Sequence, residues 1–218
     1  MKQSTSSKKI RANSKNKEML LTISDRDGTL VEFVSYLGKD ENWKDQTKLN
    51  LPVIKLLKYI FANYKNKLFV VTNQAGVARK HYDCKRVEEI NKFIESKLAK
   101  HKIKIDGWNY CPDVDKNYVT KHLEIDFDNQ FIKKQTSRKP AVNMVLELLS
   151  KRNLSLSSFQ KVLVLGDSED DRGLAENLNC NFINVKEKTY KQLKDEFLTA
   201  ALRDSKKIYD EKDFSFRK

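Results

Sequence analysis

The segment formed by residues 20–30 constrains the fold of this chain most strongly. It begins with an apolar, partly β-branched run and then places Asp25 and Asp27 at alternate positions, directly before Gly28. This order is typical of a buried strand that ends in an acidic site. Neighbouring carboxylates resist joint ionisation unless a cation or a shared proton relieves them, so the pair indicates a metal site.

Two other structures could carry the same residues. For an isolated Asp-Xaa-Asp-Gly segment, a turn is the simpler interpretation, because Asp and Gly are common turn residues. An EF-hand calcium loop fits less well, since it requires glycine at its sixth position, whereas Gly28 is the fourth residue counted from Asp25. Residues elsewhere in the chain must decide between these structures.

Strand-like segments alternate with amphipathic helices along the rest of the chain. Apolar runs predict strands at 67–72, 103–110, 162–165 and 182–185. Helical spacing predicts helices at 52–64, 87–98, a third that Pro140 opens, and a last one at 190–201. The alternation predicts an α/β fold with three layers, in which a Rossmann-like central parallel sheet carries helices on both faces. Residues 31–49 are expected to form an ordered flap near the carboxylates, and residues 111–138 stay unassigned.

Polar residues follow three of the predicted strands. The segment at 20–24 runs into Asp25, the next strand runs into Thr72, Asn73 and Gln74, and a later one runs into Gly166 and Asp167. In parallel sheets, ligands bind beyond the carboxyl ends of the strands. We therefore expect these polar clusters to converge in space.

Composition favours one domain with extensions. A chain of 218 residues with 39% hydrophobic content can bury one substantial core. We expect a flexible basic arm at 1–18, a core domain at 19–203 and a charged tail at 204–218. No apolar run is long enough to span a membrane, and no secretory signal is evident near the start of the sequence. We therefore expect a cytoplasmic protein with no membrane partner, and a monomer is favoured.

The net charge bears on the possible partners of the protein, and the cysteine content bears on disulfide and zinc sites. The formal net charge of +13 favours phosphates or nucleic acid as partners, although lysines on solvated helix faces would also account for it. Cys84, Cys111 and Cys180 are odd in number and far apart. They fit neither a disulfide framework nor a paired-cysteine zinc site, so we expect reduced thiols.

Four motifs in order resemble those of the haloacid dehalogenase (HAD) superfamily, and the resemblance spans residues 19–185. The motifs are Asp25-Arg26-Asp27-Gly28-Thr29-Leu30, Thr72-Asn73-Gln74, Arg138-Lys139-Pro140, and Gly166-Asp167 with Asp170 and Asp171. The resemblance implies a phosphatase that works through an aspartyl-phosphate. Because few residues separate the second motif from the third, we expect a minimal cap domain or none.

The resemblance also implies roles for the motif residues. Asp25 would be the nucleophile, and Asp27 would protonate the leaving oxygen and later deprotonate water. Thr72 would bind the phosphoryl oxygens, and Lys139 would neutralise charge on Asp25 and the transferring group. Taken singly, Thr72 would be better interpreted as a cap at a strand end, and Lys139 as part of a basic turn before a helix.

A magnesium ion follows from the same resemblance. Asp25, Asp167 and the backbone carbonyl of Asp27 would bind it, and oxygen ligands suit this hard cation. Either Asp170 or Asp171 could supply a further acidic group. Ser168 and Asp171 could also form a helix capping box, which is compatible with a metal role for Asp167.

Within the superfamily, the motifs look most like subclass IIIA. This group holds heptose 1,7-bisphosphate phosphatases, histidinol phosphatases and polynucleotide 3′-phosphatases, and the heptose enzymes match best. By that resemblance Arg79 and Arg138 could hold a second substrate phosphate, because a forked guanidinium suits phosphate. Asn73 and Gln74 are expected to contact substrate as well. Solvated surface arginines are the alternative interpretation of Arg79 and Arg138.

One departure from the heptose enzymes concerns zinc. Their zinc loop begins with Cys-Pro and ends in Cys-Xaa-Cys, whereas here Cys111 is followed later by Gln135 and Ser137 in place of the last cysteines. His122 is the only histidine between them, so four Cys and His ligands cannot be assembled. We expect no structural zinc.

Three functions therefore stay open at this point. The first is a magnesium-dependent phosphomonoester hydrolase that acts on a small sugar phosphate or bisphosphate such as heptose 1,7-bisphosphate. The second is a 3′-phosphatase on nucleic-acid ends, which the basic charge favours but the lack of an evident cluster of aromatic residues disfavours. The third is a non-catalytic protein that binds phosphate or nucleic acid. Its expected signature would be loss of Asp25, Asp27 or Lys139, and all three are present.

Overall fold

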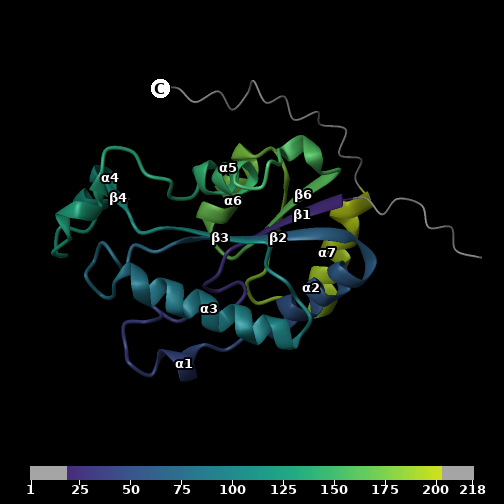
Figure 1. Cartoon of the computed structure of the whole chain (residues 1–218), viewed down its shortest axis with the longest axis horizontal. Coiled ribbons are helices and arrows are strands. Elements are labelled where there is room, and N and C mark those ends of the chain that lie inside the picture. Colours follow the sequence, from purple (N-terminus) through teal and green to yellow (C-terminus); the bar gives the residue numbers. More distant parts are fainter. Residues whose placement is uncertain (1–18, 203–218) are drawn as a thin grey trace, which may run out of the picture.

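A five-stranded parallel sheet forms the centre of the protein, in a computed structural model that describes residues 19–202 (Figure 1). The strand order is β3-β2-β1-β6-β7. The strands are β1 (Met19–Ser24), β2 (Lys65–Asn73), β3 (Gly107–Cys111), β6 (Lys161–Gly166) and β7 (Asn181–Asn184). The predicted arm at 1–18 and tail at 204–218 lie outside the described residues.

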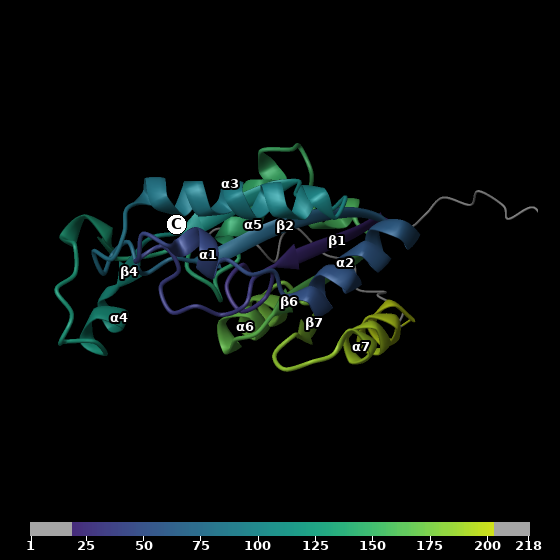
Figure 2. The same ribbon diagram turned by 90° about the horizontal axis from the view of Figure 1, so that it is seen from below.

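Helices cover both faces of the sheet (Figures 1 and 2). One face carries α2 (Leu51–Asn63), α3 (Cys84–Lys100) and α7 (Tyr190–Leu202), and the other carries α5 (Asn143–Ser150) and α6 (Glu169–Asn177). A short 3₁₀ turn, Leu156–Ser158, precedes β6. The predicted three-layer α/β fold is thus confirmed.

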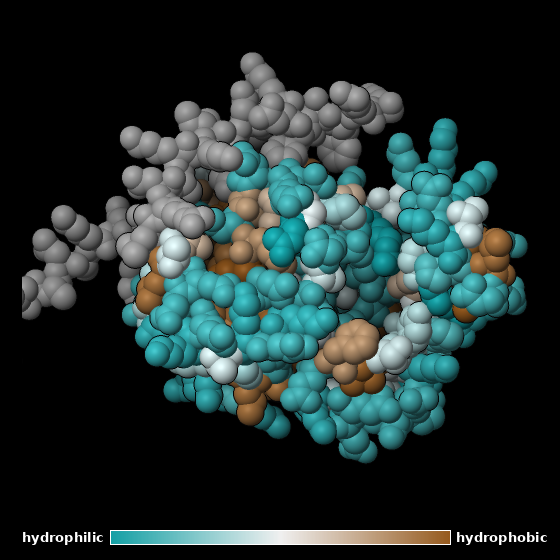
Figure 3. All heavy atoms as spheres, turned by 180° about the vertical axis from the view of Figure 1, so that it is seen from behind, coloured by the Kyte–Doolittle hydropathy of each residue, from teal (hydrophilic) through white to brown (hydrophobic). Residues whose placement is uncertain are grey.

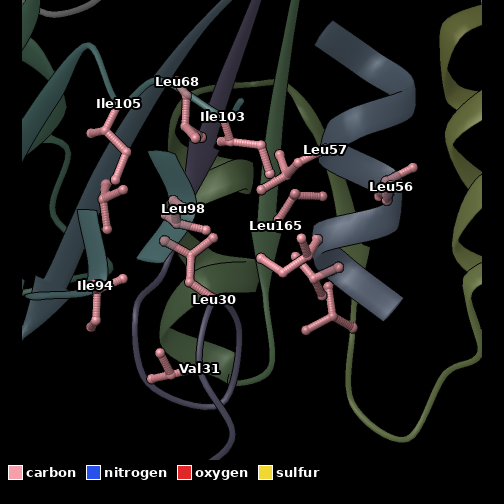
Figure 4. Close-up of a cluster of buried hydrophobic side chains, with 14 of the residues drawn as sticks. Leu30, Val31, Leu56, Leu57, Leu68, Ile94, Leu98, Ile103, Ile105 and Leu165 are labelled. Carbon is pink, nitrogen blue, oxygen red and sulfur yellow. The ribbon is translucent and has the colours of Figure 1, made fainter. Parts of the chain in front are cut away.

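Two apolar cores hold the layers together, one on each face of the sheet. Figure 4 shows the larger core, where Leu57 of α2 and Leu98 of α3 lie against Leu68 and Leu165 of the sheet. Along β1, Leu20 packs into this core and Leu21 packs into the other one. Strands buried on both faces must be apolar at consecutive positions, which is why these segments were visible as apolar runs.

The strand register brings the predicted motifs to one edge of the sheet. Ser24, the last residue of β1, pairs with Val70 of β2 and with Leu165 of β6. Beyond it, the Asp25 N–H donates to the Leu165 carbonyl at 3.0 Å. The residues that follow β1, β2 and β6 therefore leave the sheet at the same end.

Two predicted boundaries were wrong. The third helix begins at Asn143 and not at Pro140, because the Ala141 N–H donates to the Arg138 carbonyl and places Pro140 in a turn. The predicted strand at 103–110 begins only at Gly107. Ile103 lies in the connection before it and is buried against the larger core, so its apolar character comes from packing and not from strand pairing.

A flap and an insertion flank the end of the sheet that carries the motifs. The flap, residues 31–49, includes the short helix α1 (Trp43–Gln46), and Trp43 is buried in the larger core. The insertion, residues 112–137, holds α4 (Lys116–Thr120), a 3₁₀ turn (Asn129–Phe131) and a parallel pair of short strands, β4 (Val114–Asp115) and β5 (Ile132–Lys133). Figure 3 shows the surface hollowed between the insertion and the rest of the domain.

The insertion has a small apolar core of its own. Val114 and Phe127 are buried there against Ala75 and Ala78 of the loop after β2. Cys111 donates to the Asp113 carbonyl at a sulfur-to-oxygen distance of 3.6 Å. Apolar packing thus holds this segment together, and the absence of a structural zinc stays a prediction.

Within residues 19–202, no helix has both the length and the apolar character needed to cross a membrane.

Candidate active site

A buried lysine lies between two carboxylates at the carboxyl end of the sheet. The Lys139 Nζ donates to Asp25 Oδ1 and to Asp171 Oδ1, each at 2.6 Å. The side chains of Lys139 and Asp171 are 3% and 1% exposed, and that of Asp25 is 10% exposed. Three motifs that are far apart in the sequence therefore meet at a single ammonium group.

Burial controls the electrostatics of this group. The pKa of Asp25 is raised to about 7, chiefly by burial; Lys139 opposes this rise, and the carboxylates of Asp171 and Asp27 contribute to it. For Lys139, burial alone lowers the pKa, but the carboxylates of Asp25 and Asp171 outweigh it and raise the pKa above its ordinary value. Because excess negative charge is concentrated out of water, a further cation would stabilise the ionised carboxylates.

Three carboxylates are close enough together to share such a cation. Oxygen atoms of Asp25, Asp167 and Asp171 all lie within 4.8 Å of one another. Oxygen donors of this type fit Mg²⁺, as the chemistry of a hard cation requires. Thr29, which is fully buried, donates to Asp167 Oδ1 at 3.2 Å and orients it.

The structure distinguishes Asp170 from Asp171, either of which could supply the further acidic group of the fourth motif. Asp171 faces Lys139, and its Oδ2 accepts from the Ser168 hydroxyl at 2.6 Å in a capping box at the start of α6. Asp170 instead accepts from Asn73 at 2.9 Å and lies 3.5 Å from Arg138. Asp171 is therefore the residue that joins the carboxylate group.

Asp27 lies beside these three carboxylates, and its own carboxylate accepts hydrogen bonds from other residues. Its Oδ1 accepts from Arg26 Nε at 3.1 Å, and its Oδ2 accepts from Arg26 Nη2 and Gln74 Nε2 at 2.9 and 2.8 Å. The carboxylate is therefore held by a guanidinium and an amide. Metal binding through the Asp27 backbone carbonyl stays a prediction.

The second motif forms a network behind Asp27. Gln74 is 2% exposed and also donates to Thr72 Oγ1 at 2.9 Å, while the Tyr82 hydroxyl donates to Gln74 Oε1 at 3.0 Å. Since Thr72 Oγ1 accepts here, its own hydrogen is free to donate to another group. In the Gln74 amide, by contrast, both Nε2 and Oε1 already form hydrogen bonds.

Asn73 braces the third motif. Its Oδ1 accepts from the Lys139 N–H at 2.8 Å, and its Nδ2 donates to the Lys139 carbonyl at 3.2 Å. These bonds fix the backbone from which Lys139 reaches Asp25.

Arg79 and Arg138 share one aromatic ring. The Tyr118 hydroxyl of α4 accepts from Arg79 Nε and Nη2 at 3.2 and 2.9 Å. Arg79 Cζ lies 5.3 Å, and Arg138 Cζ 4.9 Å, from the centre of the Tyr118 ring. The rings of Tyr36 and Phe127 also contact Arg79, at 5.5 and 5.7 Å. The two arginines are therefore organised by stacking and hydrogen bonds, which solvated surface arginines would not be.

This aromatic group corrects an argument made from the sequence. The absence of an aromatic cluster along the chain counted against nucleic acid, yet Tyr36, Tyr118 and Phe127 meet around Arg79. They come from the flap and the insertion, so their proximity has no signal in the linear sequence.

Comparisons with known proteins agree with this geometry. No protein-family model matches the chain. Curated relatives include the D-glycero-β-D-manno-heptose-1,7-bisphosphate 7-phosphatases of Photorhabdus laumondii, 27% identical over 147 residues, and of Escherichia coli K12, 28% identical over 147 residues. These alignments cover 67% of this chain and 69% and 68% of the relatives. The chain is therefore similar to these phosphatases over about two thirds of its length.

Solved structures show that this chain shares its fold with other proteins. D,D-heptose 1,7-bisphosphate phosphatase from B. bronchiseptica, complexed with magnesium and phosphate, has a TM-score of 0.56 and 21% identity, over 74% of this chain and 78% of that one. A HAD-like phosphatase from Mesorhizobium loti has a TM-score of 0.57 and 22% identity, over 75% and 71% of the two chains.

Several residues at the candidate site were not predicted from the sequence to have a role there. Arg26, Thr29, Tyr82 and Tyr118 each touch a predicted site residue. Thr29 and Arg26 lie inside the first motif, so proximity to Asp25 could have indicated them. Tyr82 and Tyr118 are distant in sequence and required the fold.

Gly28 allows the first and fourth motifs to lie close to each other. We expect its replacement to weaken metal binding. Its φ is +77°, and a Cβ atom there would lie 2.3 Å from Asp167 Oδ2. Gly28→Ala should lower the free energy of unfolding by about 1–2 kcal/mol from the left-handed backbone alone. It should also displace Asp167, so that more Mg²⁺ is needed for half-maximal activity in a Mg²⁺ titration.

Gly38→Ala is the matched control for Gly28→Ala. Gly38 also has a positive φ, +108°, but an added Cβ there would meet Ile90 and not Asp167. This variant should lose stability and keep the wild-type Mg²⁺ requirement. An equal change of Mg²⁺ requirement in both variants would contradict the role given to Gly28.

Proposed function

We propose that this protein is a magnesium-dependent phosphomonoester hydrolase that works through an aspartyl-phosphate on Asp25. Its proposed substrate is a sugar bisphosphate such as heptose 1,7-bisphosphate. The observation that carries the proposal is the position of Lys139, whose Nζ lies 2.6 Å from Asp25 Oδ1 within a group of three carboxylates. The names of the curated relatives supply the sugar bisphosphate.

The proposed chemistry has two displacements. A carboxylate oxygen of Asp25 attacks phosphorus, the ester P–O bond breaks, and protonated Asp27 gives its proton to the leaving oxygen. Water then attacks the aspartyl-phosphate, Asp27 takes a proton from that water, and the bond between Asp25 and phosphorus breaks. Phosphate leaves, and both aspartates return to their starting states.

The surrounding residues support both displacements. Lys139 neutralises charge that would otherwise repel an anionic substrate from Asp25, and the Thr72 hydroxyl has a hydrogen free for a phosphoryl oxygen. Asp25 and Asp167, with Asp171 close by, would hold the Mg²⁺, which when bound neutralises charge on the phosphoryl group. Because burial raises the pKa of Asp25, a nearby cation would also favour the ionised nucleophile.

The second phosphate of the substrate is assigned to Arg79 and Arg138. Arg138 Nη1 is buried, and no residue among 19–202 accepts a hydrogen bond from it, so a donor is left for an anion. Arg138 precedes Lys139 directly in the sequence, which supports a second phosphate site close to the proposed phosphoryl site. Two guanidinium groups on one ring offer the planar donors that phosphate prefers.

A phosphate-release assay tests the proposed function. Purified protein would be given heptose 1,7-bisphosphate or a 3′-phosphorylated oligonucleotide, with Mg²⁺ and with a chelator. We expect release from the sugar with Mg²⁺ only. Release from the oligonucleotide alone would favour the 3′-phosphatase, for which the aromatic group around Arg79 and the net charge of +13 are the supporting observations. No release from any phosphomonoester would favour a non-catalytic binding protein.

Tyr118→Phe tests the second phosphate site. The change removes the hydroxyl that accepts from Arg79 and keeps the ring beneath Arg138. We expect KM for the bisphosphate to rise about 10-fold, because a hydrogen bond to a charged group contributes about 1.5–3 kcal/mol. Turnover of p-nitrophenyl phosphate, which has a single phosphate, should not change.

Tyr59→Phe, on α2 at the opposite end of the domain, is the matched control. It should change neither KM for the bisphosphate nor turnover of p-nitrophenyl phosphate. If Tyr118→Phe altered KM equally for both substrates, the assignment of the second phosphate to this arginine pair would fail.

A further inference from the structure

Arg26 is the buried charge that the proposed reaction leaves unused. Its side chain is 0% exposed, although it lies between Asp25 and Asp27 at the edge of the site. A buried guanidinium is costly unless it is paired and its donors are satisfied. Its partners should therefore indicate why the chain keeps it there.

The hydrogen bonds of Arg26 converge on Asp27. Nε and Nη2 form a two-pronged pair with Asp27 Oδ1 and Oδ2, and Nη1 donates to Asn91 Oδ1 of α3 at 2.9 Å. Asn91 is itself buried, with 6% of its surface exposed. The guanidinium plane is therefore fixed on two sides, and it fixes the plane of the Asp27 carboxylate.

The two oxygens of Asp27 are not equivalent in this arrangement. A carboxylate has about four lone-pair directions, two on each oxygen. Oδ2 accepts from both Arg26 Nη2 and Gln74 Nε2, whereas among residues 19–202 Oδ1 accepts only from Arg26 Nε. One acceptor position is therefore left, and it is on Oδ1. The Asp27 side chain is 22% exposed, so it is not closed off from solvent.

We propose that Arg26 is a positioning residue that makes Asp27 Oδ1 the oxygen that carries the transferred proton. Arg26 and Gln74 occupy Oδ2, and Asn91 holds Arg26 in place. The inference rests on the proposed role of Asp27 as general acid and base, and it adds which of its atoms acts and what orients it.

Leaving groups of different basicity test this role. An alkyl phosphate needs a proton on its leaving oxygen, whereas 2,4-dinitrophenyl phosphate departs without one. The ratio of kcat/KM values for the two substrates therefore reports proton donation in the first displacement. A residue that merely supports the fold would change both values equally.

Arg26→Lys is the informative substitution, because lysine keeps the charge and loses the fork. We expect kcat/KM for the alkyl phosphate to fall on the order of 10- to 100-fold, which is less than the roughly 10²–10⁴-fold contribution of a general acid because Asp27 itself is retained. The value for the dinitrophenyl ester should stay within about 3-fold. Asn91→Ala should give the same pattern with a smaller loss, and it serves if the Arg26 variant does not fold. Arg152→Lys, whose Nη1 binds the Leu148 carbonyl in another part of the domain, should change neither value.

Asp27→Asn, measured in parallel, separates the two levels of the proposal. If it lowers kcat/KM equally for both substrates, the general-acid role of Asp27 in the proposed function is wrong. Asp27→Asn could lower kcat/KM more for the alkyl phosphate than for the dinitrophenyl ester while the Arg26 and Asn91 variants do not. Asp27 would then be the acid, and the inference about Arg26 would be overturned. Discrimination in all three variants is the expected result.

Discussion

Asp25→Asn is expected to abolish turnover while leaving the fold intact. The substitution removes the proposed nucleophile, so kcat for p-nitrophenyl phosphate should fall by at least about 10⁴-fold, as losses of essential nucleophiles do. The side chain keeps its shape, and its Oδ1 can still accept from Lys139. Because burial disfavours the charge that the change removes, the melting temperature of the Mg²⁺-free protein should not decrease.

A chemical readout strengthens this test. Acid quenching during turnover of a radiolabelled substrate should trap a phosphorylated wild-type protein, with the label on Asp25 in peptide mapping, and no label in Asp25→Asn. Asp106→Asn is a matched control. Asp106 pairs with Lys67 at 3.0 Å beside β2, so its variant should lose some stability and keep its turnover. Turnover by Asp25→Asn close to that of the wild type would refute the nucleophile assignment.

The residues that the sequence could identify are those whose chemistry is tied to a strand end. Asp25, Thr72 and Asp167 each follow an apolar run, and parallel strands bring such ends together. The sheet order and the meeting of Lys139 with Asp25 are consistent with this rule. Local sequence was sufficient here because the strands themselves align the motifs.

Other features depended on side-chain direction, which the sequence does not specify. Asp170 and Asp171 are adjacent and chemically identical, and only the start of α6 at Glu169 decides that Asp171 faces Lys139. Arg26 was named only as a member of the first motif, since nothing local shows that an arginine is buried. Tyr118 meets Arg79 through an insertion whose short elements have no clear periodicity, so its role required the tertiary structure.

Lys139→Met is expected to impair both catalysis and stability, for two separable reasons. Loss of the cation that faces the transferring group should lower kcat by about 10²–10³-fold, as for other preorganised electrostatic groups. In the Mg²⁺-free protein it also leaves Asp25 and Asp171 buried without their counter-charge. Breaking such a pair should reduce the free energy of unfolding by about 3 kcal/mol, toward the lower end for buried ion pairs because the carboxylates can bind protons.

Mg²⁺ should restore much of the lost stability in Lys139→Met but little of its activity. Without the neighbouring ammonium charge, the carboxylates should bind the cation more tightly, and tighter binding to the folded state raises stability. Lys67→Met is the matched control, since Lys67 is 34% exposed and its pair with Asp106 should contribute at most about 1 kcal/mol. Unfolding curves recorded with and without Mg²⁺ measure the difference. Equal stabilisation by Mg²⁺ in the wild type and in Lys139→Met would mean that Lys139 and the cation do not act on the same carboxylates, and the proposed metal site would have to lie elsewhere.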